Sequence, residues 1–202
     1  MPISLPTTPG PRKVRLRPAR AAAFVASPYS FAGQAQVHPG ARWLVELELP
    51  LMDRASAEPW IAALLQLDGP AGTFLLGDPL GTSPRGSAAG TPRVAGGGQT
   101  GRTLSTDGWT PDAAGVLLAG DWIQLGSGEQ QRIYKVQGDV DADAAGAASV
   151  SIWPDLRESP ADAEALVLTA PQGVFRLAGG ELPYEEVPPD LYDIAFAAVE
   201  AL

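Results

Sequence analysis

The strand–helix–strand pattern over residues 43–78 constrains the fold most, because no other stretch carries so much patterned apolar sequence. Apolar and charged residues alternate over 42–49, which is typical of a half-buried β-strand. An apolar stripe at helical spacing then predicts a helix over 53–67, with Asp53 as its N-cap. A short apolar run over 73–76 has strand character. We expect this unit to form the core of the main domain.

The rest of the chain favours short strands over helices. The 202 residues include 23 Gly and 20 Pro, which suit many turns, and only 53–67 has a strong helical pattern. We therefore predict a mainly β protein. The absence of cysteine excludes disulfides, thiolate metal sites and thiol catalysis. No apolar run approaches the roughly 18 residues of a membrane span, and the first residues lack the order of a signal peptide, so we expect no membrane span and no export.

Charge is distributed very unevenly along the sequence. The first 45 residues contain no acid and six bases, whereas all 23 acidic residues lie from Glu46 onward. Such asymmetry fits a nucleic-acid arm, a face that meets an acidic face of a neighbouring copy, or chance placement on a solvated edge. No aromatic residues are interleaved with the bases, so stacking on nucleic-acid bases is not indicated. The acidic remainder favours protein–protein complementarity.

The N-terminal part reads as a series of short elements. Residues 1–11 carry four prolines and no periodicity, which predicts an extended N-terminal arm that orders only against a partner. Residues 13–17 form a basic-faced strand that Pro18 should end, and 21–25 are its candidate partner. Another strand is expected over 31–37, closed by a turn at residues 38–40.

The C-terminal part predicts a second unit inserted into the first. Residues 80–102 are rich in glycine and proline and are interpreted as a linker. Strand-like runs over 122–125, 131–136 and 148–153 then predict a small β-barrel-like module over 103–172. The last patterned stretch, 191–202, fits a strand or an alanine-rich helix; we favour a strand. The main domain would comprise residues 12–79 and 173–202.

Two short motifs resemble cofactor and metal sites but lack the required context. The glycines of G-x-G-x-x-G at 96–101 have neither a preceding strand nor a following helix, which dinucleotide binding requires. Asp139, Asp141 and Asp143 have the spacing that begins a calcium loop. Ala144 and Val150 occupy the positions where an EF-hand needs glycine and glutamate. We expect neither a cofactor nor a metal.

Catalytic groups are likewise not arranged in a recognisable set. Glu46 and Glu48 share one side of a strand, as paired catalytic carboxylates do, but alternating charge on an exposed face explains them equally well. The single histidine, His38, rules out a metal cluster built on several histidines. Ser83 does not lie in a nucleophile elbow. The sequence predicts a protein that is not an enzyme.

Several phrases of the chain resemble a family of small tail proteins from long-tailed, siphovirus-type phages. They are GTFLLGDPLGTSPRG (72–86), GGGQTGRTLSTDGW (97–109), LLAGDWIQLG (117–126), SIWPDLRESPADA (151–163) and LYDIAFAAVEAL (191–202). The resemblance implies a structural component of the distal-tail type, at the junction of tail tube and tip. It also implies a tube-type β-sandwich or split barrel with one flanking helix and a projecting second β-module.

The same resemblance implies partners and a location. Proteins of this type close into a hexameric ring and meet the tail tube, the tail hub or tip and the tape measure protein in the virion tail, after assembly in the cytoplasm of the bacterial host. Ring closure requires two different faces that complement each other. We therefore predict a subunit interface that involves Arg12, Lys13, Arg15, Arg17, Arg20, Glu46 and Glu48.

A carbohydrate- or host-surface-binding module at the tail tip is the alternative function. Trp109, Trp122 and Trp153 lie in the predicted inserted module and are candidate platforms for a sugar ring. Packing in the core of that module is the competing interpretation for each of them.

Overall fold

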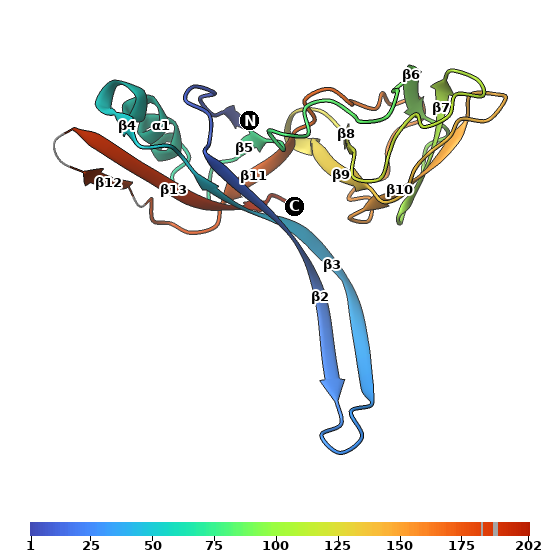
Figure 1. The fold of residues 1–202 in the computed structure, drawn as a ribbon, viewed down its shortest axis with the longest axis horizontal. Helices are drawn as coiled ribbons and strands as arrows, with labels where there is room; N and C mark the ends of the chain where they lie inside the picture. The colour runs from blue at the N-terminus through green and yellow to red at the C-terminus, as the bar shows by residue number, and fades with distance from the viewer. Residues whose placement is uncertain (183, 188–189) are drawn as a thin grey trace.

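The computed structural model describes residues 1–182, 184–187 and 190–202, and it is mainly β, with 43% strand and 8% helix. Figure 1 shows two sheets, with a long hairpin that projects from the first. The first sheet has eight strands and curls into a half barrel. Its strands are β1 (Ile3–Ser4), β2 (Lys13–Ala26), β3 (Gly33–Glu48), β4 (Met52–Asp53), β5 (Phe74–Leu76), β11 (Gly173–Leu177), β12 (Tyr184–Val187) and β13 (Leu191–Glu200).

The second sheet lies between β5 and β11 in the sequence and has the order β6–β7–β10–β9–β8. Its strands are β6 (Gly90–Val94), β7 (Thr103–Trp109), β8 (Trp122–Leu125), β9 (Arg132–Val136) and β10 (Ala148–Trp153), and a short 3-10 turn, η1 (Gly128–Gln130), precedes β9. The sheet has its own core of buried residues, which includes Leu104, Ile123 and Val150.

β6 lies inside the predicted 80–102 linker, so that prediction is wrong for residues 90–94. The proline and glycine of β6 are tolerated because it is an edge strand.

The helix and central strand agree with their predicted periodicity. Helix α1 (Arg54–Gln66) begins after Asp53, whose carboxylate accepts the backbone N–H of Ser56 at 3.0 Å. Its buried face includes Trp60 and Leu64 and packs on the larger sheet, which buries Trp43, Val45, Leu47 and Leu49 on alternate positions. The prediction of a terminal strand is also confirmed, because β13 lies between β11 and β3.

The N-terminal arm is partly ordered within its own chain. β1 adds to β5 as a parallel strand, and the Ile3 N–H donates to the Thr73 carbonyl at 2.9 Å. Ile3 and Leu5 also pack against the core of the larger sheet. The prediction that residues 1–11 order only against a partner is therefore wrong, because apolar side chains at this end reach the chain's own core.

Two predicted breaks in the first strands are absent. Pro18 lies inside β2, and residues 38–40 lie inside β3. Residues 21–25 continue β2 instead of pairing with it, and 33–37 pair with them as the start of β3. Because β2 is the outermost strand of its sheet, proline is tolerated there. Residues 38–40 form a bulge, since the pairing shifts between Arg20–Ala41 and Ala22–Val37.

Candidate assembly surface

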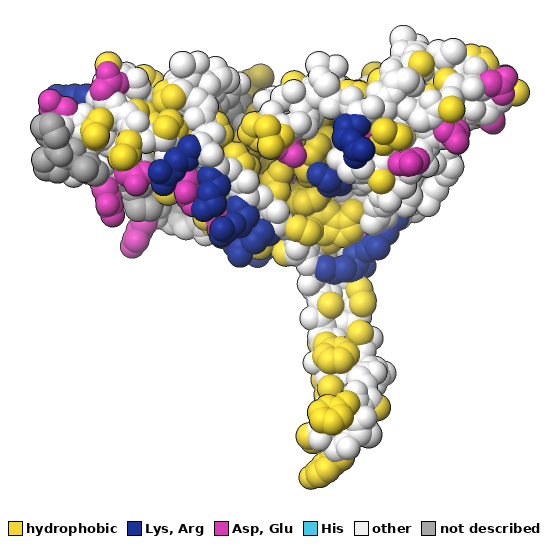
Figure 2. Space-filling view, in the orientation of Figure 1, with side chains coloured by type: hydrophobic (Ala, Val, Ile, Leu, Met, Phe, Trp, Pro, Cys, Tyr) yellow, Lys and Arg dark blue, Asp and Glu magenta, His cyan; other side chains and the backbone are white. Residues whose placement is uncertain are grey.

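The outer half of the β2–β3 hairpin, residues 21–40, forms an arm that stands free of both sheets (Figure 1). We call these residues the hairpin arm. Nearly every residue in it is exposed, and Tyr29 and Phe31 are 96% and 85% exposed. Figure 2 shows apolar side chains along the arm as far as its tip. An isolated two-stranded hairpin is marginally stable in water, so such an arm is typical of a segment that a partner covers.

The hairpin arm has one apolar face. The pairing of Ala22 with Val37 and of Phe24 with Ala35 puts these four side chains on the same side, whereas Gln34 and Gln36 lie on the other. The Phe24 ring occupies the space that a side chain at residue 33 would need, which explains the glycine there. Residues 21–41 contain no Lys, Arg, Asp or Glu. A surface that covers the arm therefore need not neutralise any of these charges.

The predicted interface charges meet one another at the base of the hairpin. On neighbouring strands, Lys13 donates a hydrogen bond to Glu48 at 2.6 Å, and Arg15 donates one to Glu46 at 2.9 Å. Arg12 forms a further ion pair with Glu48, and Arg17 forms one with Glu46. The hydrogen bond from Lys13 lowers the pKa of Glu48. Each carboxylate is shared between two bases, so this face keeps an excess of positive charge.

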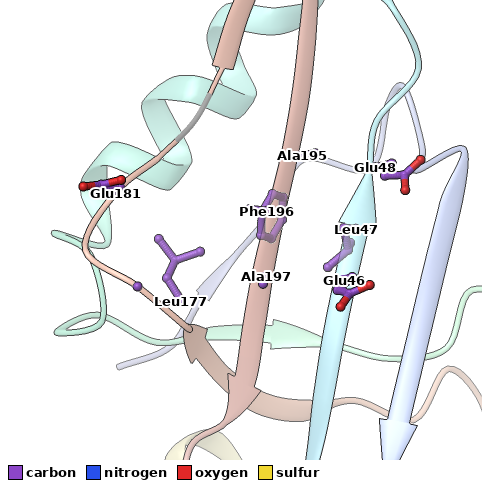
Figure 3. Close-up of a pocket in the computed structure, with 9 residues that line it drawn as sticks. Glu46, Leu47, Glu48, Leu177, Glu181, Ala195, Phe196 and Ala197 are labelled. Atoms are coloured by element: carbon purple, nitrogen blue, oxygen red, sulfur yellow. The ribbon is translucent and has the colours of Figure 1, made fainter.

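A shallow groove of 440 Å³ runs along the same face of the sheet (Figure 3). Ala195 and Ala197 of β13 lie beside Glu48 and Glu46 of β3, and Glu181 lies on the far side of the groove. The small side chains of β13 leave room for another backbone to approach closely. The groove thus has an apolar floor, and the glutamates on its β3 side are already paired with the bases of the neighbouring segment.

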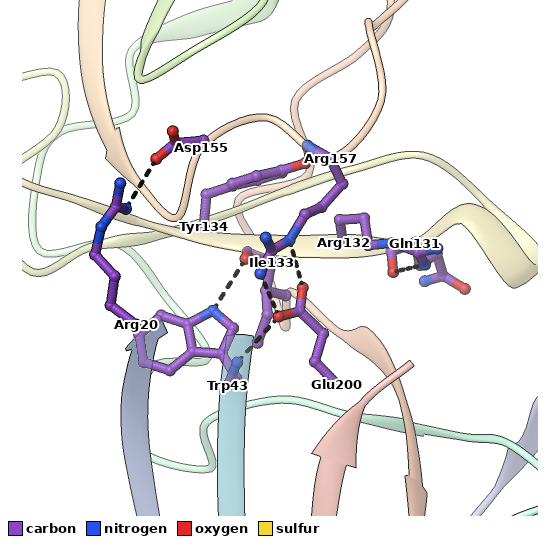
Figure 4. Close-up of polar contacts among 9 residues, drawn as sticks. All are labelled: Arg20, Trp43, Gln131, Arg132, Ile133, Tyr134, Asp155, Arg157 and Glu200. Atoms are coloured by element: carbon purple, nitrogen blue, oxygen red, sulfur yellow. Dashed lines mark hydrogen bonds and ion pairs between the residues drawn. The ribbon is translucent and has the colours of Figure 1, made fainter. Parts of the chain in front are cut away.

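A buried ion pair joins the two sheets (Figure 4). Glu200, 4% exposed, accepts hydrogen bonds from Arg157 Nη2 at 2.6 Å and Nε at 3.1 Å. The same carboxylate accepts the backbone N–H of Trp43 at 3.0 Å. The Arg157 backbone N–H in turn donates to the hydroxyl of Tyr134, whose pKa is raised by burial. These contacts hold the second sheet against β3 and β13.

A second link lies at the base of the hairpin. Asp155 accepts hydrogen bonds from Arg102 at 2.6 Å and from Arg20 at 3.5 Å (Figure 4 shows the latter). The hydrogen bond from Arg102, supported by the charge of Arg20, holds the pKa of Asp155 below its ordinary value. Arg20, predicted at a subunit interface, thus pairs with the second sheet of its own chain.

Three of the five tryptophans gather at the same junction. Trp43 packs against Trp122 and Trp153, with ring centroids 4.9 and 4.4 Å apart. A hollow of 370 Å³ opens beside them and is lined by Pro18, Trp43, Gly120, Lys135, Val136, Gln137 and Trp153, which we call the aromatic hollow. The Lys135 Nζ lies 4.1 Å from the centre of the Trp122 ring.

Two of the three predicted sugar platforms are buried. Trp109 is 3% exposed and donates to the Thr106 hydroxyl at 2.8 Å. Trp122 is 4% exposed and donates to Asp78 at 3.0 Å. Neither can present a ring face to a ligand, so the platform prediction is wrong for both, because each packs in a core. Trp153 alone is partly exposed, where it lines the aromatic hollow.

The three aspartates with calcium-loop spacing accept hydrogen bonds from backbone N–H groups of the chain. Asp139 accepts the N–H of Ala119, Asp141 that of Gly115, and Asp143 those of Ala145 and Ala147. In the described part of the chain, no group of three or more His, Cys, Asp or Glu residues is arranged to hold a metal ion. Among those residues, no helix is long and apolar enough to cross a membrane.

Sequence reasoning missed the hairpin arm and the aromatic hollow. One signal for the arm was present: residues 21–41 lack Lys, Arg, Asp and Glu, although they include Phe24, Tyr29 and Phe31. Comparisons with protein-family models and with curated proteins find no match for this chain.

Proposed function

We propose that this protein is a structural subunit of a long-tailed phage tail, a distal-tail ring protein that joins the tail tube to the tip complex. The tail role follows the sequence resemblance, and the observation that supports an assembling subunit is the hairpin arm, which leaves Tyr29 and Phe31 exposed among the described residues. A monomer that acts alone gains nothing from such an exposed apolar element. A subunit that assembles with copies of itself buries it.

Other features support an assembly role. The larger sheet curls into a half barrel with one flanking helix, which is compatible with the tube-type split barrel that the resemblance implies. The second sheet is inserted between β5 and β11, as an outward module would be. The face with Lys13, Arg15, Arg17 and the two glutamates lies beside the base of the arm. In this proposal the partners are further copies in a hexameric ring and the neighbouring tail proteins, and the function involves no catalysis.

Electron microscopy of the purified full-length chain tests this function. We expect closed rings with a central hole and one subunit number, in line with a mass measured by light scattering. A chain that stays monomeric at high concentration, and that antibodies do not find in tails of the producing phage, would contradict the proposal.

A further inference from the structure

We propose that the tip of the hairpin arm of one copy inserts into the aromatic hollow of a second copy, an inference that rests on the assembly function above. We define the hairpin tip as residues 27–32. The contact would be head-to-tail, because the tip lies at the far end of the hairpin, whereas the hollow lies between the base of the hairpin and the second sheet. Such an interface generates a ring when its rotation closes.

The hairpin tip is a well-formed turn. The Ser27 N–H donates to the Ala32 carbonyl at 2.9 Å, and the Phe31 N–H donates to the Ser27 carbonyl at 2.9 Å. The Ser27 hydroxyl also accepts the N–H groups of Tyr29 and Ser30. Phe31 has a φ of 55°, a left-handed conformation that is strained for a bulky residue. The turn thus fixes the backbone that carries the two exposed aromatic side chains, which lowers the cost of ordering this backbone on docking.

The aromatic hollow offers the matching chemistry. Pro18 and the partly exposed Trp153 supply its apolar lining, and the buried Trp43 supports Trp153 by ring packing, with centroids 4.4 Å apart. Aromatic rings pack favourably against such a lining. At its rim, Lys135 has no ion pair with the described residues, and the Gln137 side chain is exposed. Either can donate a hydrogen bond to the hydroxyl of an inserted tyrosine.

A second copy is favoured as the occupant over other ligands. The hairpin arm leads away from both sheets, so its tip cannot return to the hollow at its own base (Figure 1). The tip carries no formally charged side chain, and it therefore buries no ion when it enters an apolar hollow. One chain thus carries both an aromatic hollow and an exposed aromatic tip, and the two can meet only between copies.

Two variants remove one half of the contact each. The tip variant Tyr29→Ser with Phe31→Ser removes the rings, and the hollow variant Gln137→Trp fills the hollow from an exposed rim position. Each should weaken self-association at least about tenfold, as expected for central interface residues. Leu80→Ser, at another exposed apolar residue, and Gln130→Trp, at another exposed glutamine, are matched controls and should associate like the wild type.

A mixing experiment gives the sharpest test. The hollow variant keeps an intact tip and the tip variant keeps an intact hollow, so an equal mixture should form one-to-one dimers that grow no further. Light scattering and native mass spectrometry measure the masses. Failure of the mixture to form dimers, or wild-type association by either variant, overturns the contact. So does a glycan array in which the wild-type hollow binds a sugar while Gln137→Trp abolishes that binding without weakening self-association.

The outcomes separate this inference from the proposed function. Rings that form normally from the tip variant leave the assembly function in place and reject this contact. A wild-type chain that never self-associates rejects both.

Discussion

At the residue scale, Glu200 is the side chain on which the junction of the two sheets depends most. Its carboxylate is the acceptor for the Arg157 guanidinium and for the Trp43 backbone N–H. Arg157 is itself 11% exposed, so removal of its partner leaves a nearly buried, unpaired charge.

Glu200→Ala should lower the free energy of unfolding by about 3–5 kcal/mol, the usual effect of breaking a buried ion pair on one side. Urea denaturation followed by fluorescence measures it. Glu58→Ala is the matched control, because Glu58 is 50% exposed and pairs at 3.1 Å with Arg54, which is 76% exposed; its effect should be about 0–1 kcal/mol. Equal effects for both variants would contradict the assigned role of Glu200.

Asp155 should make stability depend on pH in the acid range. Its pKa in the folded protein lies below the ordinary value of 3.8, chiefly because of Arg102, so its contribution is fully present above the unfolded pKa. The contribution is lost as the pH falls from about 3.8 through the folded pKa. The difference in free energy of unfolding between the wild type and Asp155→Asn should therefore exist at pH 7 and shrink below pH 4. Denaturant unfolding at several pH values measures it, and a difference independent of pH would contradict the ion-pair role.

At the element scale, the hairpin arm is separable from the folded core. None of residues 21–40 is buried, whereas Ala41 and Trp43, which follow, are buried. Replacement of residues 21–40 by an Asn-Gly turn should leave the melting temperature of the monomer within a few degrees and abolish self-association. Circular dichroism and light scattering measure the two effects. Loss of folding would show that the arm belongs to the core.

Charge reversal can test whether assembly depends on the basic residues in and beside β2 that pair with Glu46 and Glu48 of β3. Simultaneous reversal of Arg12, Arg15 and Arg17 to Glu should block ring assembly, and the monomer should stay folded, since exposed ion pairs contribute little to stability. Addition of Lys13→Glu, Glu46→Lys and Glu48→Lys restores the cross-strand pairs with opposite sign. If assembly requires the positive edge, this compensated variant should still fail to form rings. Assembly by either variant would show that contacts between subunits do not depend on this charge.

At the scale of the whole molecule, the two sheets should unfold together. The Trp43 indole N–H donates to the Ile133 carbonyl at 3.3 Å, and Trp122 and Ile133, from the second sheet, belong to the core cluster of the first. A shared core couples the two sheets in one cooperative transition. We expect coincident urea transitions by fluorescence and by circular dichroism. Two separated transitions would show that the sheets are independent domains.

Periodicity alone identified the elements whose environment is local. Helix α1 and the inner half of β3 carry strong apolar patterns, and the Asp53 cap lies where the sequence places it. The sequence predicts strand breaks at Pro18 and at residues 38–40, and neither break occurs. Pro18 is tolerated on an edge strand and residues 38–40 form a bulge, and both features depend on which strands are neighbours. β6 was likewise not predicted within the glycine-rich stretch, because this strand forms only through its pairing with β7.

Sequence patterns were enough to predict a mainly β chain with one strong helix and with six bases and no acid in its first 45 residues, because spacing and charge can be read directly from the order of residues. Only the tertiary structure decided that Arg15 and Arg17 pair with Glu46, that Trp109 and Trp122 are buried and that Tyr29 and Phe31 are exposed. Pairing and burial depend on strand register and on the packing of one sheet against the other. These relations join residues far apart in the chain, and no local pattern encodes them.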